Sequence, residues 1–155
     1  MKPAVLKILS FIFLLVTAVA CSKNNDTPPV AAPKSKTIII TQSAWKIQSV
    51  GVDANKDGVV ETDITMLVQA CKLDNRYTFK TDGTGSMDEA SAKCSDTDPQ
   101  TQPYTWTFKN TETILSGTFS FSNGDATIVS MNETSLVVAY DDAATGSHLL
   151  ATLKH

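Results

Sequence analysis

The sequence predicts an all-β fold: a small, eight-stranded, antiparallel up-and-down barrel with one short helix after the first strand. Apolar and polar residues alternate in several short segments, most clearly over residues 104–109. This period of two is typical of strands with one buried face. Turn-forming residues separate the segments, and Asn123-Gly124 is a strong signal for a hairpin.

Eight segments follow this alternating pattern, and most are joined by short connections. They are residues 45–52, 76–80, 84–88, 104–109, 115–121, 126–131, 135–140 and 149–153. Short connections favour pairing between consecutive strands, and closure of such a meander removes its exposed edges. An immunoglobulin-like sandwich is the competing fold. It expects a tryptophan between two widely spaced cysteines, whereas Trp45 and Trp106 both lie outside residues 71–94.

One segment has the period of a helix instead. Ile64, Leu67, Val68 and Cys71 are spaced as i, i+3, i+4 and i+7, and residues 62–63 offer a threonine or an aspartate as the N-cap. We therefore expect about two turns of amphipathic helix that plug one end of the barrel.

The N-terminus predicts an export signal over residues 1–20. Lys2 and Lys7 precede an apolar run of about 13 residues, which is shorter than the ~20 that a membrane-spanning helix needs. Residues 18–21, Ala-Val-Ala-Cys, resemble the lipobox of bacterial lipoproteins. That resemblance implies lipidation of Cys21; the alternative is an ordinary signal cleaved before a free cysteine.

Residues 21–36 predict a lipidated, extended tether, because they are rich in proline and small polar residues and lack aromatic residues. The remaining residues, 37–155, form the predicted barrel domain. Ser22 after the cysteine resembles the pattern of lipoproteins sorted to the outer membrane of Gram-negative bacteria. The expected location is thus the cell envelope, with the membrane as a partner through the lipid.

The cysteine count predicts one disulfide. Once Cys21 carries a lipid, Cys71 and Cys94 remain as a pair in an exported chain. Their disulfide would stabilise the fold by roughly 3 kcal/mol on the chain-entropy model. His148 and His155 are the only histidines, so a cysteine–histidine zinc site is poorly supported.

Composition argues against several functional classes. Without Lys2 and Lys7, 11 basic residues face 16 acidic ones, a net charge of about −5, which does not suit a nucleic-acid-binding protein. The sequence has no G-x-S-x-G, H-E-x-x-H, P-loop or G-x-G-x-x-G motif. We therefore expect a protein that is not an enzyme.

The sharpest chemical motif is "DANKDGVVETDI". It matches the first half of a calcium loop, in which alternating oxygen ligands surround the ion. The candidate ligands for weak calcium binding are Asp53, Asn55, Asp57, Glu61 and the carbonyl of Val59. Position twelve is Ile64, where such loops carry a bidentate glutamate. The alternative is a solvated turn, since aspartate, asparagine and glycine all favour turns.

Three stretches carry a resemblance to a known family. "SAWKIQSV", "CKLDNRYTFKTDGTGSMDE" and "SAKCSD" are similar to the lipocalin-like domains of small Gram-negative envelope lipoproteins, over residues 43–155. The resemblance implies a Cys71–Cys94 pair and a barrel that binds a small apolar or amphipathic ligand. The aromatic residues expected to line or fill its lumen are Trp45, Tyr77, Phe79, Trp106 and Phe108. The alternative is an envelope interaction or structural module with a packed barrel.

Overall fold

A computed structural model of the chain describes residues 32–119 and 122–155. Within it, Pro33–His155 form one compact unit. The predicted signal (residues 1–20), the lipidation site at Cys21 and most of the tether lie outside the described residues. None of the helices formed by the described residues has the length and apolar character needed to cross a bilayer.

Antiparallel strands dominate the fold, and the sheet runs in the order β2-β1-β9-β8-β7-β6-β5-β4-β3. The strands are β1 (Lys46–Val52), β2 (Thr62–Asp63), β3 (Arg76–Phe79), β4 (Thr84–Asp88), β5 (Thr101–Lys109), β6 (Ile114–Thr118), β7 (Asn123–Met131), β8 (Ser135–Asp141) and β9 (His148–Lys154). The helices are α1 (Lys36–Thr41), the 3-10 helix η1 (Thr65–Leu67) and α2 (Ala70–Leu73). The predicted all-β meander is confirmed, with the two-residue β2 as a ninth strand.

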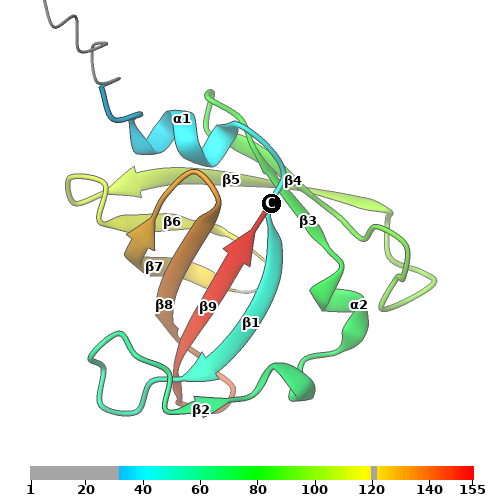
Figure 1. Ribbon diagram of the computed structural model, residues 1–155. Coiled ribbons are helices and arrows are strands. Elements are labelled where there is room, and N and C mark those ends of the chain that lie inside the picture. The colour runs from blue at the N-terminus through cyan, green and yellow to red at the C-terminus, as the bar shows by residue number, and fades with distance from the viewer. Residues whose placement is uncertain (1–31, 120–121) are drawn as a thin grey trace, which may run out of the picture. The chain divides into compact units, whose positions relative to one another are not determined.

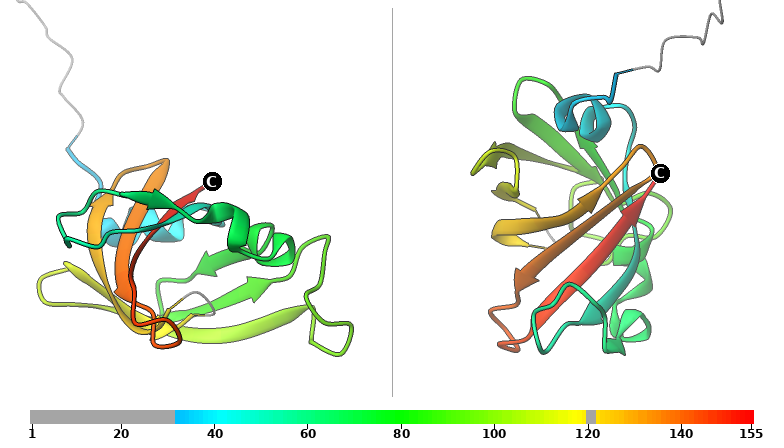
Figure 2. Two further views of the ribbon diagram at one scale, coloured as in Figure 1. Left: turned by 90° about the horizontal axis from the view of Figure 1, so that it is seen from below. Right: turned by 60° about the vertical axis from the view of Figure 1, so that its left-hand side comes forward.

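The sheet curls around a single core (Figures 1 and 2). The burial pattern of strand β5 explains this arrangement. As predicted, its residues alternate: Tyr104 and Trp106 are buried, and Thr105 and Thr107 are exposed. One face of each strand can therefore turn inward while the other faces solvent.

Closure differs from the predicted barrel. The two ends of the sheet meet at one isolated bridge, where Trp45 and Tyr77 exchange two main-chain hydrogen bonds of 2.8 Å each. Further along β1, Gly51 and Val52 pair with β2 instead of β3. The sheet therefore stays open at that end, because β2 and the segment after it occupy the space between β1 and β3.

The helix that covers the other end of the sheet is α1, which the sequence did not predict as a helix (Figure 1). Ser35 caps it by accepting a hydrogen bond from the main-chain N–H of Ile38 at 3.3 Å. Ile39 and Ile40 are buried in the core, and the indole of Trp45 donates to the carbonyl of Ile40 at 2.9 Å. The helix thus supplies the plug that we expected from residues 64–71.

The predicted helix over residues 64–71 is wrong. Two short helices, η1 and α2, replace it, and Val68 between them has an extended conformation. The segment is fastened to β1, since the Thr65 hydroxyl accepts from the N–H of Val50 at 2.9 Å and lies 3.2 Å from its carbonyl. A chain that follows the edge of β1 cannot also wind into a continuous helix, and Leu67 consequently stays exposed.

Aromatic side chains fill the interior. Phe79 contacts Tyr104, Trp106 and Phe119, with ring centroids 5.5, 5.4 and 5.8 Å apart respectively. Gly85 pairs with Tyr104, and a Cβ at this glycine would meet the Tyr104 ring at 2.2 Å. The absence of a side chain at Gly85 thus lets the tyrosine ring lie across β4.

The hairpin joining β6 and β7 exists, but Asn123-Gly124 is not its turn. Asn123 pairs with Thr118 and Gly124 with Gly117, so both residues belong to the ladder. Gly124 has φ of 137°, which other residues rarely adopt, and this accounts for glycine there.

Cys71 and Cys94 form a disulfide, which joins α2 to the loop between β4 and β5. The same loop is also held by Asp74, whose carboxylate accepts hydrogen bonds from the N–H and hydroxyl of Ser91 at 3.1 and 2.7 Å. The hydroxyl bond lowers the pKa of Asp74 below its usual value of 3.8. Cross-links from α2 therefore fix a loop that has little secondary structure of its own.

We expect the Cys71→Ala/Cys94→Ala double variant to lose about 2–4 kcal/mol of unfolding free energy, because its unfolded chain regains the freedom that the cross-link removes. Urea unfolding followed by fluorescence measures the loss, and reduced wild-type protein should unfold like the variant. Equal midpoints for the oxidised protein and the variant would contradict this role.

Candidate functional site

A cavity of about 440 Å³ lies at the open end of the sheet, away from α1. Its wall comes from the inner faces of β1, β3, β8 and β9 and from the η1–α2 segment. The lining residues are Ile47, Val50, Ile64, Leu67, Val68, Gln69, Lys72, Tyr77, Tyr140, Asp142 and Leu149. We call it the mouth cavity, because it occupies the place where β3 would otherwise continue to pair with β1.

Six of the residues that line the mouth cavity are aliphatic, and the other five carry polar groups. Lys72 on α2 and Asp142 after β8 bring opposite charges to the rim. A hydrogen bond from the Thr145 hydroxyl, 2.6 Å from the Asp142 carboxylate, lowers the pKa of Asp142, so this group is an anion at neutral pH. A lining that combines apolar and polar groups suits a small amphipathic molecule.

Tyr140 brings a phenol to the same wall. Burial raises its pKa to about 12, and the charge of Asp142 acts in the same direction. The phenol therefore stays protonated at neutral pH.

Of the five aromatic residues expected in the lumen, Tyr77 lines the mouth cavity. Trp45, Phe79 and Trp106 are buried in the packed core, with exposed fractions of 0, 2 and 7%. Phe108 packs against Trp106 with ring centroids 5.3 Å apart, and both border a separate surface hollow near Thr37. The deep interior is thus filled by side chains, and the open space lies at the mouth.

Sequence reasoning missed most of the residues that line the mouth cavity. Tyr140 and Leu149 lie in segments expected to be strands, and Ile47 and Val50 lie in the first of them. Alternation could have placed these side chains on the inner face. It could not have shown that the sheet opens beside them, because that depends on where β2 pairs.

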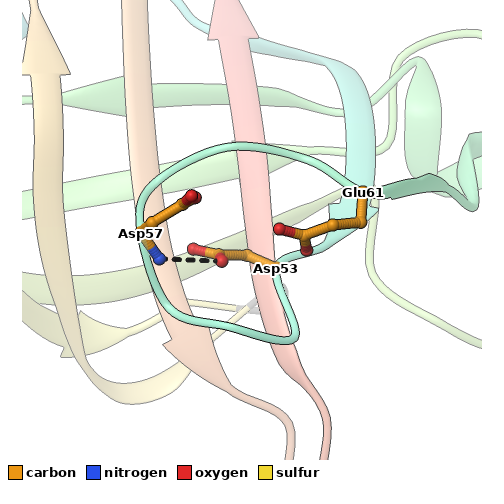
Figure 3. Close-up of side chains that lie close together, drawn as sticks. All are labelled: Asp53, Asp57 and Glu61. Carbon is orange, nitrogen blue, oxygen red and sulfur yellow. Dashed lines mark hydrogen bonds between the residues drawn. The ribbon is translucent and has the colours of Figure 1, made fainter.

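The second candidate site is the loop between β1 and β2 (Figure 3). Asp53, Asp57 and Glu61 each bring a carboxylate oxygen to it, and these oxygens lie within 4.8 Å of one another. Asp53 is buried, with an exposed fraction of 1%, whereas Asp57 and Glu61 are exposed. The structure therefore brings together the three acidic residues of the calcium motif.

Main-chain hydrogen bonds already occupy much of this oxygen cluster. The Asp53 carboxylate accepts from the N–H groups of Asp57 and Gly58 at 3.1 and 2.9 Å. Asp57 accepts from the N–H of Val59, and Glu61 from that of Ala54, at 2.9 and 2.7 Å. These bonds make the loop a self-supporting polar turn.

The other predicted ligands occupy the exposed side of this loop. The Asn55 side chain accepts from the N–H of Asp57 at 3.0 Å, and the side chain of Val59 is 61% exposed. Lys56 reaches across to Asp141 on β8, with 3.1 Å between the ammonium and the carboxylate. This ion pair links the loop to the end of β8, across β9.

Comparison with protein families decides the affiliation of this fold. A family model described as a lipocalin-like domain matches residues 43–138. The chain belongs to this family. Lipocalin-like domains are generally non-catalytic, and their fold is compatible with binding small hydrophobic ligands. A search of curated proteins finds no significant match.

Calcium distinguishes the two interpretations of the loop between β1 and β2. A metal site without the bidentate glutamate should bind calcium with a dissociation constant of about 10⁻⁴ to 10⁻³ M. At ten times that concentration, bound calcium would stabilise the domain by about 1.4 kcal/mol and raise its melting temperature by a few degrees. Thermal melts in calcium and in chelator measure this shift.

Asp57→Ala should abolish the calcium-dependent shift, and Asp125→Ala, which removes an exposed carboxylate on β7, should keep it. Identical wild-type melts with and without calcium would identify the loop as a polar turn only.

Proposed function

We propose that this lipocalin-like domain binds a small amphipathic molecule in the mouth cavity and acts as a non-catalytic binding module of the bacterial envelope. One observation carries the proposal: the 440 Å³ cavity at the unclosed end of the sheet. Its volume falls within the range of about 300–1,000 Å³ typical of small-molecule sites.

The distribution of polar groups indicates how a ligand would lie. Ile47, Val50 and Leu149 form an aliphatic part of the wall, so an apolar chain would lie against the inner face of the paired strands β1 and β9. A polar head group would remain at the rim, near Lys72 and Asp142. This arrangement removes apolar surface from water without burying a charge.

Exposed apolar side chains at the edge of the cavity support the same proposal. Met66 and Leu67 on η1 are 98 and 81% exposed, and Leu67 also lines the mouth cavity. Large apolar side chains exposed together mark interaction sites more often than ordinary surface. The η1 segment would thus cover the apolar part of a bound ligand.

We also propose that a lipid on Cys21 anchors the domain, with the outer membrane of a Gram-negative bacterium as its location. The support comes from the sequence: a short apolar export signal, the residues Ala-Val-Ala-Cys at its end and a serine after the cysteine. The disulfide fits an oxidising compartment outside the cytoplasm.

Filling the cavity should weaken ligand binding. We expect decanoate, a single-chain carboxylate, to bind the wild-type protein, and Val68→Trp to weaken binding at least tenfold, because the indole would occupy space at the rim. Isothermal titration calorimetry measures both affinities. Thr107→Trp, at an exposed position of β5, is the matched control and should bind like wild type.

If decanoate does not bind, or if Val68→Trp binds it as tightly as wild type does, the mouth cavity is not a ligand site. The alternative of an interaction or structural module would then be favoured, since the rest of the interior is packed.

Replacing the anchor cysteine tests the location. Cys21→Ser should move the protein out of the membrane fraction, because it removes the thiol that would carry the lipid. Fractionation with a carbonate wash, together with intact mass of the wild-type protein, measures the change. A mutant that stays with the membranes, and a wild type without acyl mass, would overturn the lipid anchor.

A further inference from the structure

Three cationic residues stand side by side where the two ends of the sheet meet. Lys154 on β9 pairs directly with Lys46 on β1. Lys46 follows Trp45 in the chain and Arg76 precedes Tyr77, so both lie next to the Trp45–Tyr77 bridge. In an antiparallel pair these two neighbours lie opposite each other, so Lys46 faces Arg76 across β1 and β3. We call Lys154, Lys46 and Arg76 the basic row.

The side chains of the basic row lie on the outer face of the sheet. The adjacent residues in the chain, Trp45, Tyr77 and Leu153, are buried in the core. Because successive residues of a strand point to opposite faces, the basic row points to solvent, and all three of its residues are exposed. They come from three distant parts of the sequence, so only the folded sheet brings them together.

No counter-charge is in contact with the basic row. None of the ion pairs formed by residues 32–119 and 122–155 includes Lys46, Arg76 or Lys154. Like charges directly opposite each other in a sheet are destabilising. An external anion that contacts neighbouring members of the row would relieve this repulsion.

Two carboxylates border the same face, and hydrogen bonds within the protein occupy both. A surface hollow of about 480 Å³ is lined by Lys46 and Arg76 together with Asp74 and Asp88. Asp74 accepts from the loop between β4 and β5, and Asp88 accepts from the N–H of Ala90 at 2.7 Å. Neither carboxylate forms an ion pair among the described residues. The three cations of the row therefore outnumber the acidic groups beside them.

We propose that the basic row docks the domain on a bilayer surface that carries anionic phosphate head groups. This docking rests on the proposed lipid anchor at Cys21 and adds to it the face of the domain that turns toward the membrane. Helix α1, the start of β1 and the end of β9 lie at the same end of the domain (Figure 1). Since α1 follows the tether in the chain, the tether joins the domain beside the basic row.

The charge of the rest of the domain makes this orientation specific. Without Lys2 and Lys7 the chain has 11 basic and 16 acidic residues, so anionic head groups repel most of its surface. Each lysine or arginine near an anionic leaflet strengthens binding about fivefold, and three together favour the docked state on the order of a hundredfold. The mouth cavity lies against the inner faces of the strands, so docking through their outer faces leaves it uncovered.

The test is reductive methylation of the lipidated wild-type protein in two kinds of nanodisc. One is phosphatidylcholine alone, and the other is equal parts phosphatidylcholine and phosphatidylglycerol. In the anionic discs Lys46 and Lys154 should react about fivefold more slowly, or slower still, because the head groups cover them. Lys56 and Lys109, which form ion pairs elsewhere on the domain, should keep their rates. Mass spectrometry of peptides measures each rate, and high salt should remove the difference.

Matched variants separate the basic row from net charge. Lys46→Gln/Arg76→Gln should restore the methylation rate of Lys154 in anionic discs. Lys56→Gln/Lys109→Gln removes the same charge and should leave Lys46 and Lys154 protected. Lys46→Arg/Arg76→Lys keeps the charge of the row and should also keep Lys154 protected, which excludes a loss of protection through misfolding.

Each outcome decides the proposal. Docking is overturned, and the lipid anchor is not, if Lys46 and Lys154 react equally fast in both kinds of disc. The same holds if all four lysines are slowed alike, or if the Lys56→Gln/Lys109→Gln variant also loses the protection. A wild-type protein that carries no acyl mass and does not join the discs overturns the anchor and the docking together.

Discussion

Two main-chain hydrogen bonds between Trp45 and Tyr77 hold the ends of this sheet together. A meander of nine strands without them would expose two edges, whereas a bridge at one point allows the sheet to surround a core. The bridge lies beside α1, because the Trp45 indole donates to the carbonyl of Ile40. The helix, the bridge and the buried tryptophan thus form one closed end of the sheet. The path of the strands away from this end depends on the Trp45–Tyr77 bridge.

Away from the bridge, β1 pairs with β2 instead of β3, and this change of partner leaves room for the mouth cavity. Gly51 and Val52 pair with Asp63 and Thr62 of β2. The approach is so close that a Cβ at Gly51 would lie 2.3 Å from the Val60 side chain. A glycine at this single position therefore lets the long β1–β3 connection fold back over β1. The mouth cavity lies beside this connection, where β3 no longer pairs with β1.

The sequence was most informative where one local rule governs the structure. Alternation predicted the strands because inward positions such as Tyr104 and Trp106 bury their side chains, and family resemblance predicted the lipocalin-like fold. The prediction from local spacing was wrong over residues 64–71. Their apolar residues have helical spacing, but a hydrogen bond from the N–H of Val50 to the Thr65 hydroxyl holds the chain along β1. The sequence analysis also missed α1, because six residues are too few to show a helical period. The contact between α2 and the loop between β4 and β5 joins segments from different parts of the chain, and no local pattern encodes it.

Stability and binding are consequently separated along this domain. The end capped by α1 is packed with aromatic and aliphatic side chains, so substitutions there act mainly through packing. The long connection between β1 and β3 carries the carboxylate loop, the lip of the mouth cavity and the cysteine of α2. Apart from β2, this connection adds no strand to the sheet, so most of it can vary without breaking the ladder. Its disulfide holds α2, and with it Lys72 of the mouth cavity, against the loop between β4 and β5.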